Sequence, residues 1–285
     1  MKVFLIKISI LVLGLLIPLQ SNFVKSNDSS QDFKGQSYYM SKTRMDLGNW
    51  GARLSEAQKK EVAARMQSRL EKTYILTFNR EESMFKEEEK LDALSGATDS
   101  WGKNFTPGAQ YKNVKTNTQI QNQEFYGKQF LVKDSLQPIT WKMSGETKTI
   151  GKYNCFKATA LIPSNELTWY AFSWDKLRTK EETESETGDE KEELVEMTQV
   201  EAWFTPQIPV GHGPLEYWGL AGLILEVSAG DTTMLCFKII LNADDDIEII
   251  APKKGTEVTK LEYQDIVLNK MKEFRDNRGG RSRGR

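Results

Sequence analysis

The side chains that most often carry covalent chemistry are scarce in this sequence. It has one histidine, His212, and two cysteines, Cys155 and Cys236. A Ser-His-Asp or Cys-His site would have to use His212, which lies in Gly-His-Gly-Pro without a nucleophile-elbow pattern. We therefore predict no catalytic residue and a protein that is not an enzyme. The remaining enzymatic hypothesis is an unfamiliar hydrolase, built on His212 or on a buried pair of carboxylates.

Metal and nucleotide chemistry also lack their usual patterns. Neither CxxC nor HExxH spacing occurs, and the sequence contains no P-loop or dinucleotide-binding glycine pattern. Residues 179–194 hold eight acidic residues and two lysines, with too few apolar side chains to pack. This stretch predicts a solvated acidic loop rather than a calcium site, which usually has a tighter acidic pattern around a glycine turn. We predict no metal and no cofactor.

The first 21 residues have the layout of a secretory signal peptide. Lys2 and Lys7 precede an apolar run from Ile8 to Leu19, and polar residues follow. That run is shorter than the roughly 20 residues that a membrane span needs. We expect export to the periplasm or the cell surface, with no transmembrane segment after signal removal. An uncleaved N-terminal anchor is the alternative.

Export would expose the two cysteines to oxidising conditions. Cys155 and Cys236 lie in separate strand-like segments. They could form a disulfide that joins two strands, or they could remain two buried free thiols. The sequence leaves both alternatives open.

The charge balance argues against nucleic acid as the partner. The formal net charge is -1, and 28% of the residues are charged. The sequence ends in a Gly/Arg-rich stretch, residues 277–285, which we predict to be a flexible tail.

The most distinctive stretch predicts a loop followed by a β-hairpin. Two apolar runs, Leu223–Val227 and Thr232–Ile240, flank Gly230-Asp231, a pair typical of a type II′ turn. This turn would pair Ala229 with Thr232, Val227 with Met234 and Leu225 with Cys236. Alternation would then place Leu225, Val227, Met234 and Cys236 on one face.

This stretch resembles the signature of the GLPGLI family, exported proteins typical of Bacteroidota. Ala221 stands where the family usually has proline, which frees one backbone angle. Further similar segments follow the family's order from about residue 54 to 251. The resemblance implies export but no particular activity. It makes one set of residues the candidate binding or structural motif: Gly213, Pro214, Trp218, Gly219, Leu220, Ala221, Gly222, Leu223 and Ile224.

The remaining patterns predict a single β-rich domain over residues 54–276, after an extended or disordered lead-in over residues 22–53. Ser55 and Gln58 fit a capping box, and Val62, Ala63, Met66 and Leu70 then share a helical face. A second helix is predicted over Tyr263–Arg275. The segments between these two helices are predicted to be mostly β-strands. The fold class is therefore α+β and β-dominated: a large, curved, mostly antiparallel sheet, open like a half-barrel, with flanking N-terminal and C-terminal helices.

Three functional hypotheses follow. The first is a non-enzymatic envelope module whose apolar concave sheet, together with several tryptophans, binds a lipid, a peptide or a partner segment. The second is a structural or accessory partner of an outer-membrane protein system, acting through its outer surface without a small ligand. The third is the uncharacterised hydrolase.

Overall fold

The computed structural model describes residues 33–44, 52–88, 104, 106–174, 177–178, 195–242 and 248–281. The predicted signal peptide and the acidic loop 179–194 lie outside these ranges. The compact unit that the structure describes begins at Phe33. None of its described helices is long and apolar enough to cross a membrane.

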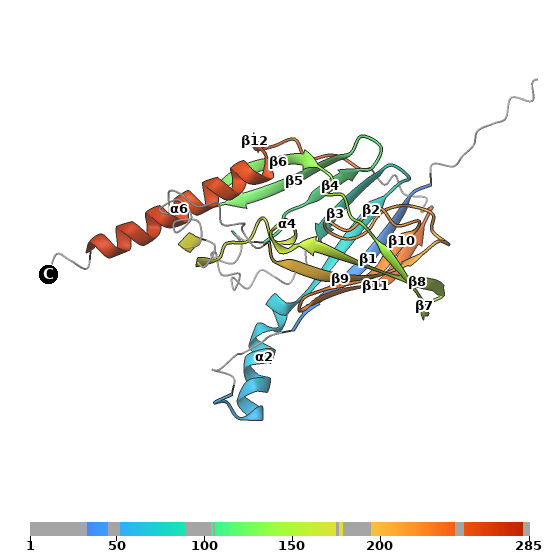
Figure 1. Cartoon of the computed structure of the whole chain (residues 1–285), viewed down its shortest axis with the longest axis horizontal. Helices are drawn as coiled ribbons and strands as arrows, with labels where there is room; N and C mark the ends of the chain where they lie inside the picture. Colours follow the sequence, from blue (N-terminus) through green and yellow to red (C-terminus); the bar gives the residue numbers. More distant parts are fainter. Residues whose placement is uncertain are drawn as a thin grey trace, which may run out of the picture. The chain divides into compact units, whose positions relative to one another are not determined.

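The described residues form one large sheet (Figure 1). Its strands run along the chain as β1 (Gly35–Thr43), β2 (Glu71–Phe78), β3 (Glu82–Glu87), β4 (Gln110–Asn113), β5 (Thr118–Phe125), β6 (Lys128–Ser135), β7 (Lys142–Ile150), β8 (Tyr153–Pro163), β9 (Met197–Thr205), β10 (Leu223–Ala229), β11 (Thr232–Leu241) and β12 (Thr256–Val258). Their order across the sheet is β12-β6-β5-β4-β3-β2-β1-β11-β10-β9-β8-β7. Neighbouring strands pair antiparallel except β12 and β6, which are parallel. The predicted fold class is therefore confirmed.

The β10–β11 hairpin follows the predicted register. Ala229 pairs with Thr232 and Val227 with Met234, and Gly230 has the positive φ, 55°, that a type II′ turn needs at its first central position. The regular pairing begins at Glu226–Leu235, because β10 has a register irregularity between Ile224 and Glu226. The predicted partnership of Leu225 with Cys236 is therefore not part of the regular ladder.

The predicted lead-in over residues 22–53, extended or disordered and outside the domain, is extended at its centre but forms part of the sheet there. Residues 35–43 form β1, which lies between β2 and β11 in the middle of the sheet. Its buried positions include Ser37, Tyr39 and Ser41. Small hydroxyl side chains at two of these positions hide the apolar alternation by which a strand is usually recognised.

Three helices complete the described fold: α2 (Glu56–Leu70), α4 (Ser164–Leu167) and α6 (Lys260–Arg281). The predicted capping box begins α2, since the Ser55 N–H donates to Gln58 Oε1 over 2.9 Å and the Gln58 N–H to Ser55 Oγ over 3.3 Å. Figure 1 shows α2 directed away from the sheet. Of its predicted apolar stripe, Val62 is partly exposed, and the other three side chains are outside the described set.

The predicted flexible tail begins too early, because α6 continues to Arg281. Tyr263, Val267 and Met271 anchor the preceding turns of this helix in a small core with Trp169, Phe125 and Phe130. Once these turns are fixed, each added residue gains a hydrogen bond without a new nucleation cost.

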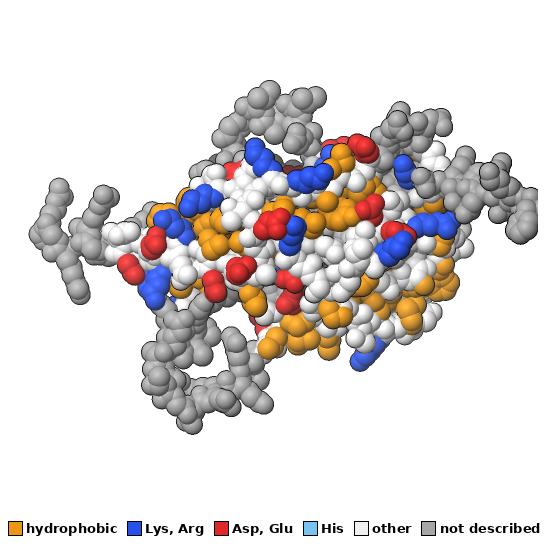
Figure 2. Space-filling view, turned by 90° about the horizontal axis from the view of Figure 1, so that it is seen from above, with side chains coloured by type: hydrophobic (Ala, Val, Ile, Leu, Met, Phe, Trp, Pro, Cys, Tyr) orange, Lys and Arg blue, Asp and Glu red, His pale blue; other side chains and the backbone are white. Residues whose placement is uncertain are grey.

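The larger core lies on one face of the sheet, which we call the inner face. It combines β1, β2 and β3 with β8, β9, β10 and β11, through side chains such as Tyr39, Leu76, Phe85, Ala202 and Val227. On the face that Figure 2 shows, hydrophobic side chains gather in exposed groups between basic and acidic side chains.

The connection between β9 and β10, residues 206–222, crosses the inner face. It contacts β4, although five strands separate β4 from β9 in the sheet order. In a flat sheet this separation would exceed 25 Å, since neighbouring strands lie about 4.8 Å apart. The connection therefore brings residues of the two halves of the sheet together.

Candidate functional site

The candidate motif forms a loop that is bonded to itself and to the sheet. The Gly219 N–H donates to the Gly211 carbonyl over 2.9 Å, and the Ile224 N–H donates to the His212 carbonyl over 3.1 Å. Gly219 has a φ of 89°, a left-handed conformation that favours glycine. The side chains of Leu220, Leu223 and Ile224 are buried. These motif residues therefore shape the loop and fill the core.

Trp218 ties the same loop to the segment that joins β6 to β7. Its indole Nε1 donates to the Gln137 carbonyl over 2.8 Å, and the Trp141 indole donates back to the Trp218 carbonyl over 2.8 Å.

The Gly213 carbonyl accepts a hydrogen bond from Lys112, and the Pro214 carbonyl accepts one from the Tyr217 N–H. Ala221, at the usual proline position, is exposed.

We predict that Gly222→Ala destabilises the fold by at least about 2 kcal/mol, because overpacking against backbone cannot relax cheaply. A Cβ at Gly222 would lie 2.2 Å from the Thr205 carbonyl oxygen. Gly211→Ala is the matched control, since its Cβ would meet its nearest atom, the Leu220 carbonyl oxygen, at an ordinary 3.6 Å. Urea unfolding of both variants measures the difference. Equal stabilities would contradict this account of the loop.

Lys112 on β4 holds the loop against the opposite half of the sheet. Its buried ammonium donates to three backbone carbonyls, those of Gly213 (2.8 Å), Leu215 (2.6 Å) and Tyr217 (3.1 Å). Burial lowers the pKa of Lys112 to about 7, and nearby Glu216 opposes this shift. All three ammonium donors are used, so Lys112 acts as a structural clasp.

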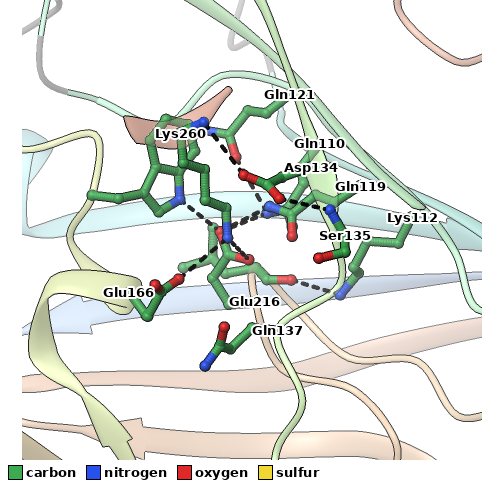
Figure 3. Close-up of polar contacts among 12 residues, drawn as sticks. Gln110, Lys112, Gln119, Gln121, Asp134, Ser135, Gln137, Glu166, Glu216 and Lys260 are labelled. Atoms are coloured by element: carbon green, nitrogen blue, oxygen red, sulfur yellow. Dashed lines mark hydrogen bonds and ion pairs between the residues drawn. The ribbon is translucent and has the colours of Figure 1, made fainter. Parts of the chain in front are cut away.

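Glu216, on the same loop, is the centre of a buried polar cluster (Figure 3). Its Oε1 accepts hydrogen bonds from Gln110 Nε2 (2.9 Å), Gln119 Nε2 (3.0 Å) and the Trp169 indole (3.0 Å). We call these four residues, together with Lys260, the Glu216 cluster.

Lys260, the first residue of α6, supplies the opposite charge. Its Nζ lies 3.7 Å from Glu216 Oε2 and 3.6 Å from Glu166 Oε2, and only 9% of its side chain is exposed. Glu166, on α4, is partly exposed. The Lys260 N–H also donates to Asp134 Oδ2 over 3.4 Å, and Thr259 with Glu262 forms a capping box there. The helix start thus fixes the position of the ammonium group.

Three oxygen atoms of the Glu216 cluster lack hydrogen-bond partners within the described part of the chain. They are Gln110 Oε1, Gln119 Oε1 and Glu216 Oε2, each inaccessible to solvent. Buried polar atoms without partners are costly and uncommon in folded proteins. The two glutamine oxygens therefore have no polar partner among the described residues, whereas Glu216 Oε2 faces the Lys260 ammonium group at 3.7 Å.

Three tyrosines lie close enough to the cluster to interact electrostatically with it or with one another. Burial, with a smaller contribution from Glu216, raises the pKa of Tyr170 to about 12. Burial likewise raises the pKa values of Tyr217 and Tyr74, with contributions from Tyr170 to both. All three hydroxyls therefore stay protonated and can donate hydrogen bonds.

His212 is buried beside this loop. Burial, with a smaller contribution from the Lys112 ammonium group, lowers its pKa to about 3, and a hydrogen bond with the Asn79 backbone opposes this shift. The imidazole is therefore neutral near pH 7, and within the described residues no hydrogen bond joins it to a nucleophilic side chain. This environment offers no support for the hydrolase version built on His212.

Both cysteines are buried free thiols in the structure. Burial raises the pKa of Cys236 to about 12 and also raises the pKa of Cys155. We predict that a thiol reagent labels neither cysteine in the native protein and labels both after unfolding without reductant. Mass spectrometry counts the labels. No label in the unfolded, unreduced protein would instead establish the disulfide alternative.

The sequence did not predict the charged and amide members of the Glu216 cluster. Gln110 and Gln119, like the neighbouring Lys112, are polar residues that pattern analysis places on the solvent side of a strand. The one usable signal was the period-two series Gln119, Gln121 and Gln123, all of which are buried on β5. Such a series marks a polar strand face, but it cannot show that the face is covered.

Comparisons with known proteins place these residues partly within a recognised region. Residues 141–226 match a family described as a protein of unknown function (Porph_ging). A comparison with curated proteins finds no match. Two solved structures titled as PNGF-II, in space groups C2 and P21, share 15% and 14% sequence identity with TM-scores of 0.48 and 0.46. They cover 82% and 81% of this chain, which spans 32% of the length of each. The segment that contains Glu166, His212, Glu216 and the candidate motif residues up to Ile224 is therefore similar to a family of unknown function.

Proposed function

We propose that this protein is an exported cell-envelope binding module without enzymatic activity, and that it is a GLPGLI protein. The signal-peptide pattern of residues 1–21 and the motif residues Gly219–Ile224 support this assignment. The family match over residues 141–226 is compatible with it.

The observation that carries the binding role is the unused hydrogen-bonding capacity at the Glu216 cluster. The inner face is apolar around the larger core, but at its β4–β5 end it presents buried glutamines, a lysine and a glutamate. A fold that needed only stability would gain more from apolar side chains at these positions. Polar groups kept there without partners favour recognition of a molecule that supplies the missing bonds.

The same geometry supports binding rather than catalysis. Glu216 Oε1 already accepts three hydrogen bonds, so it is poorly placed to remove a proton. Its second oxygen lies 3.7 Å from the ammonium group of Lys260. Within the described residues, no group of three or more His, Cys, Asp or Glu side chains could hold a metal ion.

Native mass spectrometry of protein purified gently from its own envelope tests this proposal, followed by organic extraction of the bound material. We expect a reproducible added mass on a chain that begins near residue 22. A clean unliganded mass in several preparations would contradict the binding role. An intact N-terminus in envelope fractions would contradict signal removal.

A second candidate function, an accessory partner of an outer-membrane system, is favoured by one apolar surface. Met40 on β1 pairs with Leu235 on β11, and both are exposed. Phe237 is 55% exposed and lies 6.3 Å from the ring of Tyr38. Large exposed apolar groups of this kind often mark contact surfaces. This function would be supported over the first if the protein co-purified with an envelope protein and Phe237→Glu abolished that co-purification.

A further inference from the structure

An apolar patch lies on the face of the sheet opposite the larger core, which we call the outer face. Side chains alternate along a strand, so Tyr39 enters the core while its neighbours Tyr38 and Met40 lie on the outer face. In the ladder, Tyr38 pairs with Ile75 on β2, and Met40 pairs with Leu235 on β11. Three neighbouring strands in the middle of the sheet therefore form one continuous apolar surface.

Phe237 projects from this surface. The register of β1 and β11 shifts next to Tyr38, and Phe237 is the extra residue that has no partner in the ladder. A bulge of this kind changes the direction of a side chain. Phe237 is 55% exposed, and its ring centre lies 6.3 Å from that of Tyr38. We call the outer patch the five residues Tyr38, Met40, Ile75, Leu235 and Phe237.

Two lysines form the ends of one row across the outer patch. Lys86 on β3 pairs with Ile75, Ile75 pairs with Tyr38, and Tyr38 pairs with Lys238 on β11. The Lys238 ammonium group lies 4.7 Å from the centre of the Tyr38 ring. This first row therefore carries a positive charge at each end, with apolar groups between them.

The neighbouring row carries the opposite charge at its ends. The Glu88 N–H donates to the Thr73 carbonyl over 2.8 Å, so this pair extends the β2–β3 ladder, and alternation places Glu88 on the outer face. Beyond Thr73 the row continues through Met40 and Leu235 to Glu226 on β10. This second row is therefore negative at both ends and apolar at its centre.

Two rows of opposite charge make this surface complementary to a second copy of itself. A twofold axis that runs across the strands, between the rows, places the first row of each copy over the second row of the other. Lys86 then faces Glu88 of the second copy, and neither residue forms an ion pair within the described part of its own chain. Lys238 faces the row that ends at Glu226, whose carboxylate contacts Lys148 over 2.7 Å in its own chain.

The same axis stacks the apolar groups. Tyr38 lies over Met40 of the second copy, and Phe237 lies over Leu235. Sheets that pack face to face lie about 10 Å apart, with their strands within about 30° of each other. Four strands with about five residues each cover on the order of 300 Å², an area that suits a weak, concentration-dependent dimer rather than an obligate one.

We propose that this protein forms a weak twofold dimer by stacking the outer patches of two copies, with Lys86 and Glu88 paired between the copies at the rim. This inference goes beyond the proposed binding function and does not depend on it, because the Glu216 cluster lies on the inner face. It assigns the apolar surface to a second copy of the chain rather than to another envelope protein.

Sedimentation equilibrium of the full chain tests the dimer, at protein concentrations from about 1 to 500 µM, a range that suits a weak interface. We expect a reversible equilibrium between monomer and dimer, which added salt weakens because the rim pairs are exposed. Lys86→Glu and Glu88→Lys should each raise the dimer Kd by about tenfold, since like charges then face each other at two places. The double variant exchanges the two charges and should return the Kd to within about threefold of the original value.

Phe237→Glu should abolish the dimer, because it places a charge in the apolar centre of the interface. Its matched control is Leu161→Glu, since Leu161 is 62% exposed on β8, outside the outer patch. Lys115→Glu is the control for the charge reversals, because the Lys115 side chain is 67% exposed and lies beyond the end of β4. Both controls should leave the Kd unchanged, and circular dichroism confirms that every variant is folded.

A chain that stays monomeric throughout this concentration range overturns the inference. A double variant that dimerises no better than the two single variants also overturns it, because the two rows then do not face each other. Monomeric protein that binds lipid vesicles or an envelope protein, and loses this binding with Phe237→Glu, assigns the outer patch to that partner instead. None of these results changes the native mass spectrometry on which the proposed binding function depends.

Discussion

Replacing Lys112 with methionine will lower the free energy of unfolding by at least about 3 kcal/mol, although methionine has a similar length. The ammonium group of Lys112 satisfies the carbonyls of Gly213, Leu215 and Tyr217. Methionine cannot donate, so three buried acceptors lose their partner and Glu216 loses a compensating charge. Equilibrium unfolding in urea, followed by tryptophan fluorescence, measures the loss.

Lys115→Met is the matched control for this variant. Lys115 follows the same strand, but its ion pair with Glu81 is largely exposed, at 67% and 50% of the two side chains. Surface ion pairs of this kind contribute about 0–1 kcal/mol. If Lys112→Met were no more destabilising than Lys115→Met, the clasp between β4 and the motif loop would have no energetic importance.

Mild acid will destabilise the fold through His212. Burial depresses its pKa to about 3 in the folded state, whereas the unfolded chain has the ordinary value near 6.5. Below pH 6.5 the unfolded state therefore binds a proton that the folded state excludes. The part of the free energy of unfolding that depends on the neutral form of His212 is fully present above pH 6.5. It is lost progressively as the pH falls towards 3.

Between pH 6.5 and pH 5 this loss amounts to about 1.5 kcal/mol, at up to about 1.4 kcal/mol per pH unit. The window avoids most carboxylate titration, and the chain has no second histidine. Urea unfolding at several pH values measures the slope. His212→Phe, whatever its absolute stability, should flatten the slope in this window. An unchanged slope in that variant would assign the acid sensitivity to another group.

Much of the architecture could be predicted from residue patterns because each element has a local cause. The apolar runs around Gly230-Asp231 gave the β10–β11 hairpin, and Ser55 with Gln58 gave the start of α2. Such signals are short-range: a turn or a cap is determined by residues two to four positions apart. The α+β class and the antiparallel sheet follow from the sum of these signals.

The parts that failed depend on contacts between residues far apart in the sequence. β1 was missed because Ser37 and Ser41 occupy buried positions that only the neighbouring strands cover. β12 has three residues, and its parallel partner β6 lies more than one hundred positions earlier. Nothing local marks such a pairing.

The Glu216 cluster was missed for the same reason. Its members come from β4, β5, the segment after α4, the motif loop and the start of α6. Each residue type is ordinary on a protein surface, and only the loop that crosses the inner face buries them together. Apolar patterning therefore predicted an apolar concave face, and the polar end of that face became evident only in three dimensions.

The position of β1 in the middle of the sheet also sets the order in which this protein can fold. β1 pairs on one side with β2, which is close in sequence, and on the other with β11, about two hundred residues later. The two halves of the sheet can join only when nearly the whole chain is available. Contacts of such long sequence separation slow folding to milliseconds or longer. A chain crossing a membrane as a thread would thus complete its sheet only after most of it has emerged, and until then one edge of β1 stays open.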